Sequence, residues 1–125
     1  MSGNYLTATD RNFKAEILES DKVALVDFWA AWCGPCRGFA PVFEAAAEKY
    51  PEITFAKVDT DVERDLASAA GITSIPTLMA FRDGVLVFRQ PGAMPAPGFE
   101  ELIQAVLKIN MDEVRAEIAK EESKS

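Results

Sequence analysis

Apolar residues along this chain form short, nearly continuous runs separated by longer stretches with helical spacing. Such runs lie at residues 23–30 and 53–59, and a third apolar segment, residues 76–90, is divided by Asp83-Gly84. A short apolar run with few polar interruptions is typical of a strand buried on both faces of a sheet. Asp-Gly between two apolar runs predicts a hairpin, because both turn residues need positive φ. The pattern therefore predicts two buried strands followed by an antiparallel pair.

The stretches between these runs carry apolar residues three and four positions apart, which predicts helices. The expected helices cover residues 9–20, about Cys33 to Tyr50, 60–71 and 98–108. Thr9 is expected to cap the first helix, with Leu18 on its apolar face. Thr60 and Glu63 have capping-box spacing at the start of the third helix, and Gly71 is suited to end it. Pro41 should kink the second helix, because proline removes one backbone hydrogen bond.

With a short strand at the start, the order of elements predicts an α/β fold. It consists of a central mixed β-sheet with helices on both faces and an antiparallel edge hairpin. A chain of 125 residues without repeats or a dividing linker is most simply one domain, here residues 1–108. Residues 109–125 extend beyond it. Asn110 and Glu113 predict a short separate helix there, but the apolar residues stay in phase with Leu107, so one continuous helix is an equal alternative. The last five residues are expected to fray.

Composition excludes several classes of function. A formal net charge of −7 opposes binding to nucleic-acid phosphates. The start of the chain lacks the basic and apolar regions of a signal peptide, and no apolar run approaches a membrane span, so we expect a cytoplasmic protein without a membrane partner. The absence of histidine excludes Ser-His and Cys-His catalysis, and two cysteines with carboxylates make a poor metal site.

Both cysteines lie in Cys33-Gly34-Pro35-Cys36, where the first buried strand gives way to the long helix. Free N–H groups and the helix dipole at that point stabilise an anion, so Cys33 should be activated as its thiolate. Cys36 lies one turn further on, within reach of a disulfide. We expect Cys33 to be the more exposed, attacking thiol and Cys36 the more buried, resolving thiol. Half of a metal site or two inert core thiols is the alternative, which the lack of further cysteine and histidine disfavours.

The longer sequence VDFWAAWCGPC resembles the active-site signature of the thioredoxin family. SIPT at 74–77, FRDG at 81–84 and PGA at 91–93 follow in the family's order, so the resemblance covers about Tyr5 to Lys108. It implies the thioredoxin fold and a protein-disulfide reductase that passes through a mixed disulfide on Cys33, resolved by Cys36. It also implies no bound cofactor beyond the redox-active disulfide. The partners would be disulfide-containing substrate proteins and a thioredoxin reductase that uses NADPH.

The resemblance further implies roles for residues outside the cysteine pair. Asp27 interrupts an apolar strand and would be a buried carboxyl group, with its pKa raised, that assists proton transfer at Cys36. Lys57 would neighbour it. Most X-Pro bonds are trans, but the family has a cis proline at the position of Pro76, and the backbone of Ile75 would pair with the substrate. The remaining expected contact residues are Trp32, Gly34, Pro35, Gly92 and Ala93.

Two functions of different classes remain open on the sequence. The first is a monomeric, cytoplasmic disulfide reductase that carries electrons in cell redox homeostasis. The second is a thioredoxin-fold binding subunit that stabilises a partner without using its thiols. The intact dithiol and Asp27 favour the reductase, because a scaffold would need neither.

Overall fold

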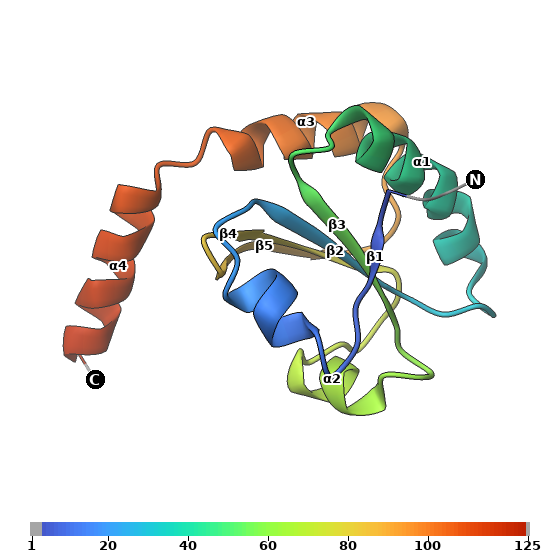
Figure 1. Cartoon of the computed structure of the whole chain (residues 1–125), viewed down its shortest axis with the longest axis horizontal. Coiled ribbons are helices and arrows are strands. Elements are labelled where there is room, and N and C mark those ends of the chain that lie inside the picture. Colours follow the sequence, from blue (N-terminus) through green and yellow to red (C-terminus); the bar gives the residue numbers. More distant parts are fainter. Residues whose placement is uncertain (1–3, 125) are drawn as a thin grey trace.

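A computed structural model describes residues 4–124 and contains one five-stranded mixed sheet (Figure 1). Its strands are β1 (Leu6–Thr7), β2 (Ala24–Trp29), β3 (Thr54–Asp59), β4 (Thr77–Arg82) and β5 (Val85–Pro91). Their order is β1-β3-β2-β4-β5, in which β1, β3 and β2 run parallel and the β4–β5 hairpin runs antiparallel at one edge. The predicted mixed sheet is therefore confirmed, and β2, which carries Asp27, is its central strand.

Helices cover both faces of the sheet, as predicted. The covering helices are η1 (Lys14–Leu18), α1 (Gly34–Lys49), α2 (Arg64–Ala69) and α3 (Ala96–Leu107), whereas α4 (Met111–Lys124) extends away from the sheet (Figure 1). On one face α1 and α3 enclose a core with Leu25, Phe43 and Phe99, and on the other η1 and α2 pack against a core with Val26 and Ile17. Adjacent residues of β2 serve opposite cores because side chains alternate across a strand. No helix among residues 4–124 is both long and apolar enough to cross a membrane.

The hairpin between β4 and β5 confirms the turn prediction. Asp83 has φ 52° and Gly84 has φ 77°, the pair of positive values that a two-residue primed turn requires. Gly84 also lies against η1, where a Cβ atom would overlap the carbonyl oxygen of Leu18. A side chain at position 84 is therefore disfavoured by conformation and excluded by space.

The first helix differs from the prediction. The Thr9 side chain does cap the segment, since its Oγ1 accepts the N–H groups of Arg11 and Asn12 at 3.2 and 3.3 Å. The helix that follows is a π-helix, in which Glu19 N–H donates to the Lys14 carbonyl at 2.8 Å. This wider turn rotates Leu18 away from the core, and it is 44% exposed rather than buried.

The expected capping box at the third helix is wrong. Helix α2 begins at Arg64, and its N-cap residue Glu63 makes no capping hydrogen bond with its side chain. Thr60 instead donates its hydroxyl to the carbonyl oxygen of Trp29 at 3.1 Å, at the end of β2. A hydrogen bond to a distant strand has replaced the local one. Gly71 ends the helix region with φ 68°, as predicted.

The C-terminal segment forms a separate helix. Asn110 Oδ1 accepts the N–H groups of Asp112 and Glu113 at 3.0 and 3.2 Å, which starts α4. The Arg82 guanidinium donates to carbonyl oxygens at the end of α3 and of Ile109, which stabilises the break between the helices. Helix α4 continues through Lys124, where fraying was expected, and Ser125 lies outside the described residues.

Candidate active site

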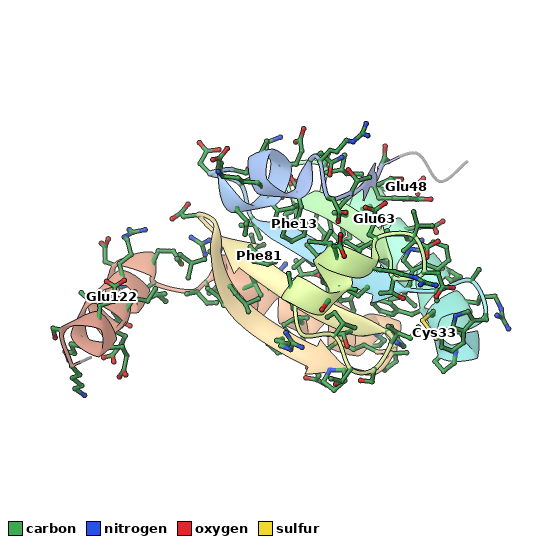
Figure 2. All side chains as sticks on the ribbon, turned by 90° about the horizontal axis from the view of Figure 1, so that it is seen from below. Phe13, Cys33, Glu48, Glu63, Phe81 and Glu122 are labelled. Carbon is green, nitrogen blue, oxygen red and sulfur yellow. A yellow bond between two sulfur atoms is a disulfide. The ribbon has the colours of Figure 1, made fainter. Side chains whose placement is uncertain are left out.

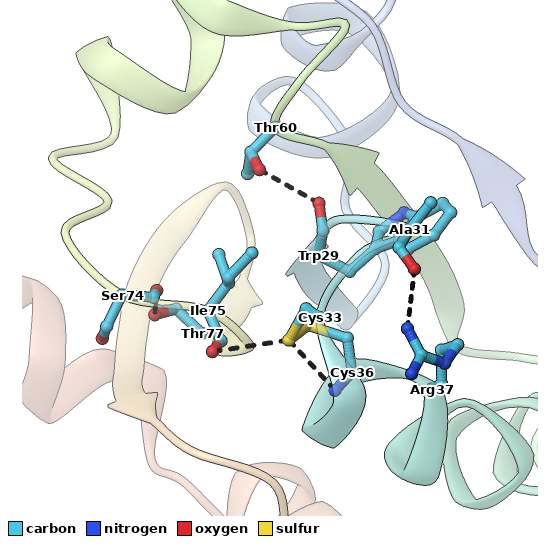
Figure 3. The surroundings of a disulfide bond; sticks show 9 residues. All are labelled: Trp29, Ala31, Cys33, Cys36, Arg37, Thr60, Ser74, Ile75 and Thr77. Carbon is cyan, nitrogen blue, oxygen red and sulfur yellow. Dashed lines mark hydrogen bonds between the residues drawn. A yellow bond between two sulfur atoms is a disulfide. The ribbon is translucent and has the colours of Figure 1, made fainter.

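The cysteine pair lies where β2 passes into α1. Cys33 is the N-cap residue of α1, with extended backbone, and Pro35 lies in the first helical turn. The two sulfurs form a disulfide, with the Cα atoms 5.2 Å apart (Figure 3). The Sγ atom of Cys33 also accepts the backbone N–H of Cys36 at 3.2 Å. The predicted position at a helix N-terminus is confirmed, and one free helix donor points at the Cys33 sulfur.

The two cysteines differ little in exposure while they are joined. Cys33 is 4% exposed and Cys36 is 2% exposed, so the order is as predicted but the contrast is small. Their surroundings differ more. Cys33 Sγ lies 3.7 Å from the carbonyl oxygen of Ile75 (Figure 3). Trp32, the residue before Cys33, is 69% exposed. Cys33 therefore faces the loop before β4, beside an exposed aromatic ring.

The loop before β4 contains the proline that the resemblance singled out. The Ile75-Pro76 bond is cis, as the family resemblance implied and against the usual preference for trans. The Thr77 hydroxyl donates to the Ser74 carbonyl at 2.6 Å and helps to hold the loop. Gly92 N–H donates to the Pro76 carbonyl at 2.7 Å, so the end of β5 lies beside the loop.

The expected contact residues do not all lie in the same environment. Pro76 is buried and Ile75 is half-buried, and Ile75 packs with the cysteine pair. The exposed members of the set are Trp32, Gly34, Pro35, Gly92 and Ala93. Ala93 follows Gly92 in the chain. The structure thus brings Ile75 to the disulfide, and Pro76 and Gly92 lie in and beside the same loop.

Asp27 is a buried carboxyl group in the central strand. It is 1% exposed, and its Oδ1 has no hydrogen-bond partner among the described residues. Burial raises the pKa of Asp27 from 3.8 to about 7, and the charge of Lys57 opposes this rise. Lys57 is the partner of Asp27 in the parallel pairing of β2 with β3. At neutral pH this carboxyl group is therefore close to half protonated.

Glu44 of α1 is a partner that sequence reasoning missed. Lys57 Nζ lies 2.7 Å from Glu44 Oε2, and the lysine is only 8% exposed. The same Nζ lies 4.6 Å from the centre of the Tyr5 ring and 5.8 Å from that of Trp29. The only signal in the sequence was an acidic residue beside the apolar face of the long helix, and that position does not specify a partner. The lysine is therefore held between a carboxylate and two aromatic rings.

The described residues contain no candidate metal site. Between residues 4 and 124, no group of three or more histidine, cysteine, aspartate or glutamate side chains is arranged to hold a metal ion. The chemistry at this site is that of sulfur: two cysteines three positions apart, one at a helix N-terminus, beside a cis-proline loop. Fold and site together define a dithiol–disulfide oxidoreductase.

Comparison with known proteins gives the same answer. The thioredoxin family model matches residues 4–108. The chain is 47% identical over 117 residues to "Putative thioredoxin 2" of Streptomyces coelicolor, covering 94% of this chain and 87% of the relative. It is 52% identical over 96 residues to "Thioredoxin 2" of Chlorobaculum tepidum, covering 76% of this chain and 88% of the relative. It is 52% identical over 88 residues to "Thioredoxin 1" of Synechococcus elongatus, covering 70% and 82%.

The chain belongs to the thioredoxin family. It is a protein-disulfide oxidoreductase that works through a dithiol–disulfide pair, and its redox-active group is the Cys33–Cys36 disulfide rather than a bound cofactor. The Streptomyces match is longer than residues 1–108, so it reaches into the C-terminal extension.

Proposed function

We propose that Cys33 attacks the substrate and that Cys36 resolves the mixed disulfide. In the reduced protein the Cys33 thiolate attacks one sulfur of a substrate disulfide, that bond breaks, and the departing thiolate takes up a proton. The Cys36 thiol then gives up its proton and attacks Cys33 Sγ, which breaks the mixed disulfide and releases the second substrate thiolate. Two electrons pass to the substrate, and the protein ends as the Cys33–Cys36 disulfide. The observation that carries this assignment is the Cys36 N–H donated to Cys33 Sγ at 3.2 Å.

Asp27 is proposed as the group that exchanges the proton of Cys36. It lies on the same strand as Leu25, two positions away, and therefore on the face of the sheet that α1 covers. A carboxyl group with its pKa at about 7 can take a proton from a thiol and return it to a leaving thiolate near neutral pH. Lys57 is proposed to limit the rise of that pKa, since its charge favours the ionised form of Asp27.

The substrate is proposed to lie in an extended conformation along the loop before β4. The Ile75 carbonyl, 3.7 Å from Cys33 Sγ, supports strand-like pairing with a segment whose cysteine has reached Cys33. Pro76, buried in this loop, would help to hold the backbone of Ile75 in position. The exposed surface around it would complete the contact area, through Trp32, Gly34, Pro35, Gly92 and Ala93.

Family membership supports the remaining proposals on partners and context. A thioredoxin reductase that draws electrons from NADPH would restore the dithiol, and disulfide-containing proteins would consume it. We place this electron transport in the cytoplasm, as part of cell redox homeostasis, and expect a monomer. Residues 1–108 would form the catalytic domain and 109–125 an appended segment, in keeping with the break between α3 and α4.

Trapping with two serine variants tests the assignment of roles. Cys36→Ser should attack substrates but remain bound to them, so non-reducing gel electrophoresis of a cell extract should show adducts that reductant removes. Cys33→Ser should form almost none, because Cys36 is buried and is not the N-cap residue whose sulfur accepts a free helix N–H. Equal adducts from both variants, or from neither, would contradict the roles. A wild-type protein that never reduces a test disulfide, even with a thioredoxin reductase, would favour the thiol-independent binding subunit.

A further inference from the structure

A pocket of about 550 Å³ opens beside the disulfide, between Trp32 and the start of α2. It adjoins the reacting sulfur in two ways. Trp32 immediately precedes Cys33, and Ile75, whose carbonyl lies 3.7 Å from Cys33 Sγ, also lines the pocket. Thr60 and Ser74 are two further lining residues, and Figure 3 shows Ser74 beside Ile75, to the left of the disulfide, with Thr60 above it. A substrate segment at Cys33 therefore has this cavity directly beside it.

Arg64 is the one charged residue among the described residues that line the pocket. Its guanidinium has no carboxylate within salt-bridge distance in the part of the chain that the structure describes. The acidic neighbours Asp61 and Asp65 do not line the pocket. Asp59 and Glu63 line a separate cavity, which also holds Lys57. A cavity next to the active sulfur thus has an arginine without a carboxylate partner in its lining, in a chain whose net charge is −7.

We propose that this pocket binds a side chain of the substrate close to the attacked cysteine, and that Arg64 selects an acidic one. In an extended segment, side chains leave the backbone alternately, so a residue near the cysteine can point into the pocket while the backbone follows Ile75. The other lining residues are uncharged. Most of them are small, and Trp32, Ile72 and Ile75 add larger apolar surfaces. Those surfaces suit the methylene groups of glutamate, and a guanidinium can hold its carboxylate with two parallel hydrogen bonds. The proposal rests on the substrate position proposed above.

The expected size of this selection follows from the exposure of Arg64. The residue lies at the surface, and exposed ion pairs change an equilibrium or a rate by about two- to fivefold. Salt screens such pairs, so the effect should shrink as ionic strength rises from about 0.05 to 0.5 M. It should appear in kcat/KM, because that constant compares the free partners with the transition state in which the pocket is occupied.

The test uses sets of three disulfide-bonded peptides. Within a set, the peptides differ only in carrying glutamate, glutamine or lysine at one position. Each set places that position one, two or three residues before or after the target cysteine. The full-length proteins are the wild type, Arg64→Gln, Arg64→Glu and Arg115→Gln. Arg115→Gln is the matched control, because it removes the same charge from α4 and not from the pocket. Hydroxyethyl disulfide, which is small and uncharged, reports the basal reactivity of the dithiol in every protein.

We expect the wild type and Arg115→Gln to reduce the best-placed glutamate peptide about two to five times faster than its glutamine counterpart. Arg64→Gln should remove this preference and Arg64→Glu should transfer it to the lysine peptide, while all four proteins reduce hydroxyethyl disulfide at equal rates. No preference for glutamate at any position in the wild type, or an equal loss of preference in Arg64→Gln and Arg115→Gln, would overturn the proposal. Failure of the underlying reductase would look different, since hydroxyethyl disulfide would then not be reduced at all.

Discussion

Replacing Asp27 with asparagine removes a buried ionisable group, whose charged form lowers the free energy of unfolding. The carboxyl group is 1% exposed, one of its oxygens has no hydrogen-bond partner among the described residues, and burial raises its pKa from 3.8 to about 7. Asparagine has nearly the same shape but cannot ionise. The oxidised Asp27→Asn variant should therefore be more stable than the wild type at neutral pH and lose that advantage in acid.

The size and direction of this effect follow from linkage between protonation and folding. Between pH 3.8 and about 7 the unfolded chain has released the Asp27 proton, whereas the folded protein still holds it. Each pH unit in that window lowers the wild-type free energy of unfolding by about 1.4 kcal/mol. The stability present below pH 4 is thus lost as the pH rises to 7, a total of roughly 4 kcal/mol. That is a large part of the 5–15 kcal/mol by which domains are usually stable.

Denaturant unfolding at pH 4, 5.5 and 8 measures the difference between the two proteins. It should grow by roughly 4 kcal/mol from the lowest to the highest pH and stay level above pH 8. Asp21→Asn is the matched control, because it makes the same chemical change at an exposed position. Single-turnover reduction provides a second measurement on Asp27→Asn. Release of the mixed disulfide should be slower near pH 7, since Cys36 has lost its proton acceptor.

A stability difference that is the same at pH 4 and pH 8 would refute the reasoning. It would mean that Asp27 is equally ionised in the folded and unfolded chains, so that burial does not hold its proton. A difference of the expected pH dependence with unchanged release of the mixed disulfide would leave the buried carboxyl group in place and remove its proposed catalytic role.

Two further changes probe the turn and the extension. Gly84→Ala should lower the free energy of unfolding by about 2 kcal/mol or more, because φ is 77° and a Cβ atom overlaps the Leu18 carbonyl; Gly38→Ala, with nothing within 4 Å of the added atom, should be neutral or stabilising in the same denaturant titration. Deleting residues 110–125 should leave insulin reduction unchanged while lowering stability by about 1–3 kcal/mol, mainly through loss of buried Met111. Figure 2 shows α4, with Glu122, at the opposite end of the molecule from Cys33, so reduced activity in a folded truncated protein would contradict the division into domain and extension.

The sequence by itself determined the features that depend on neighbouring residues. Apolar runs and helical spacing predicted the order of strands and helices, because side-chain direction repeats with a period of two or 3.6. Asp83-Gly84 predicted its hairpin because few other residues tolerate positive φ. The cysteine pair was placed at a helix N-terminus because an apolar strand ends just before it and Pro35 suits a first helical turn.

The tertiary structure decided what depends on contacts between residues far apart in the chain. Thr60 bonds the carbonyl of Trp29 rather than its own helix, and Lys57 bonds Glu44 of α1. Local chemistry offers each of these side chains several partners of similar strength, and only the packed arrangement selects one. The pocket beside Trp32 has the same origin. It exists because α2 and the loop before β4 lie beside Trp32, which brings Arg64 to the same cavity as Ile75 although no local pattern links it to either cysteine.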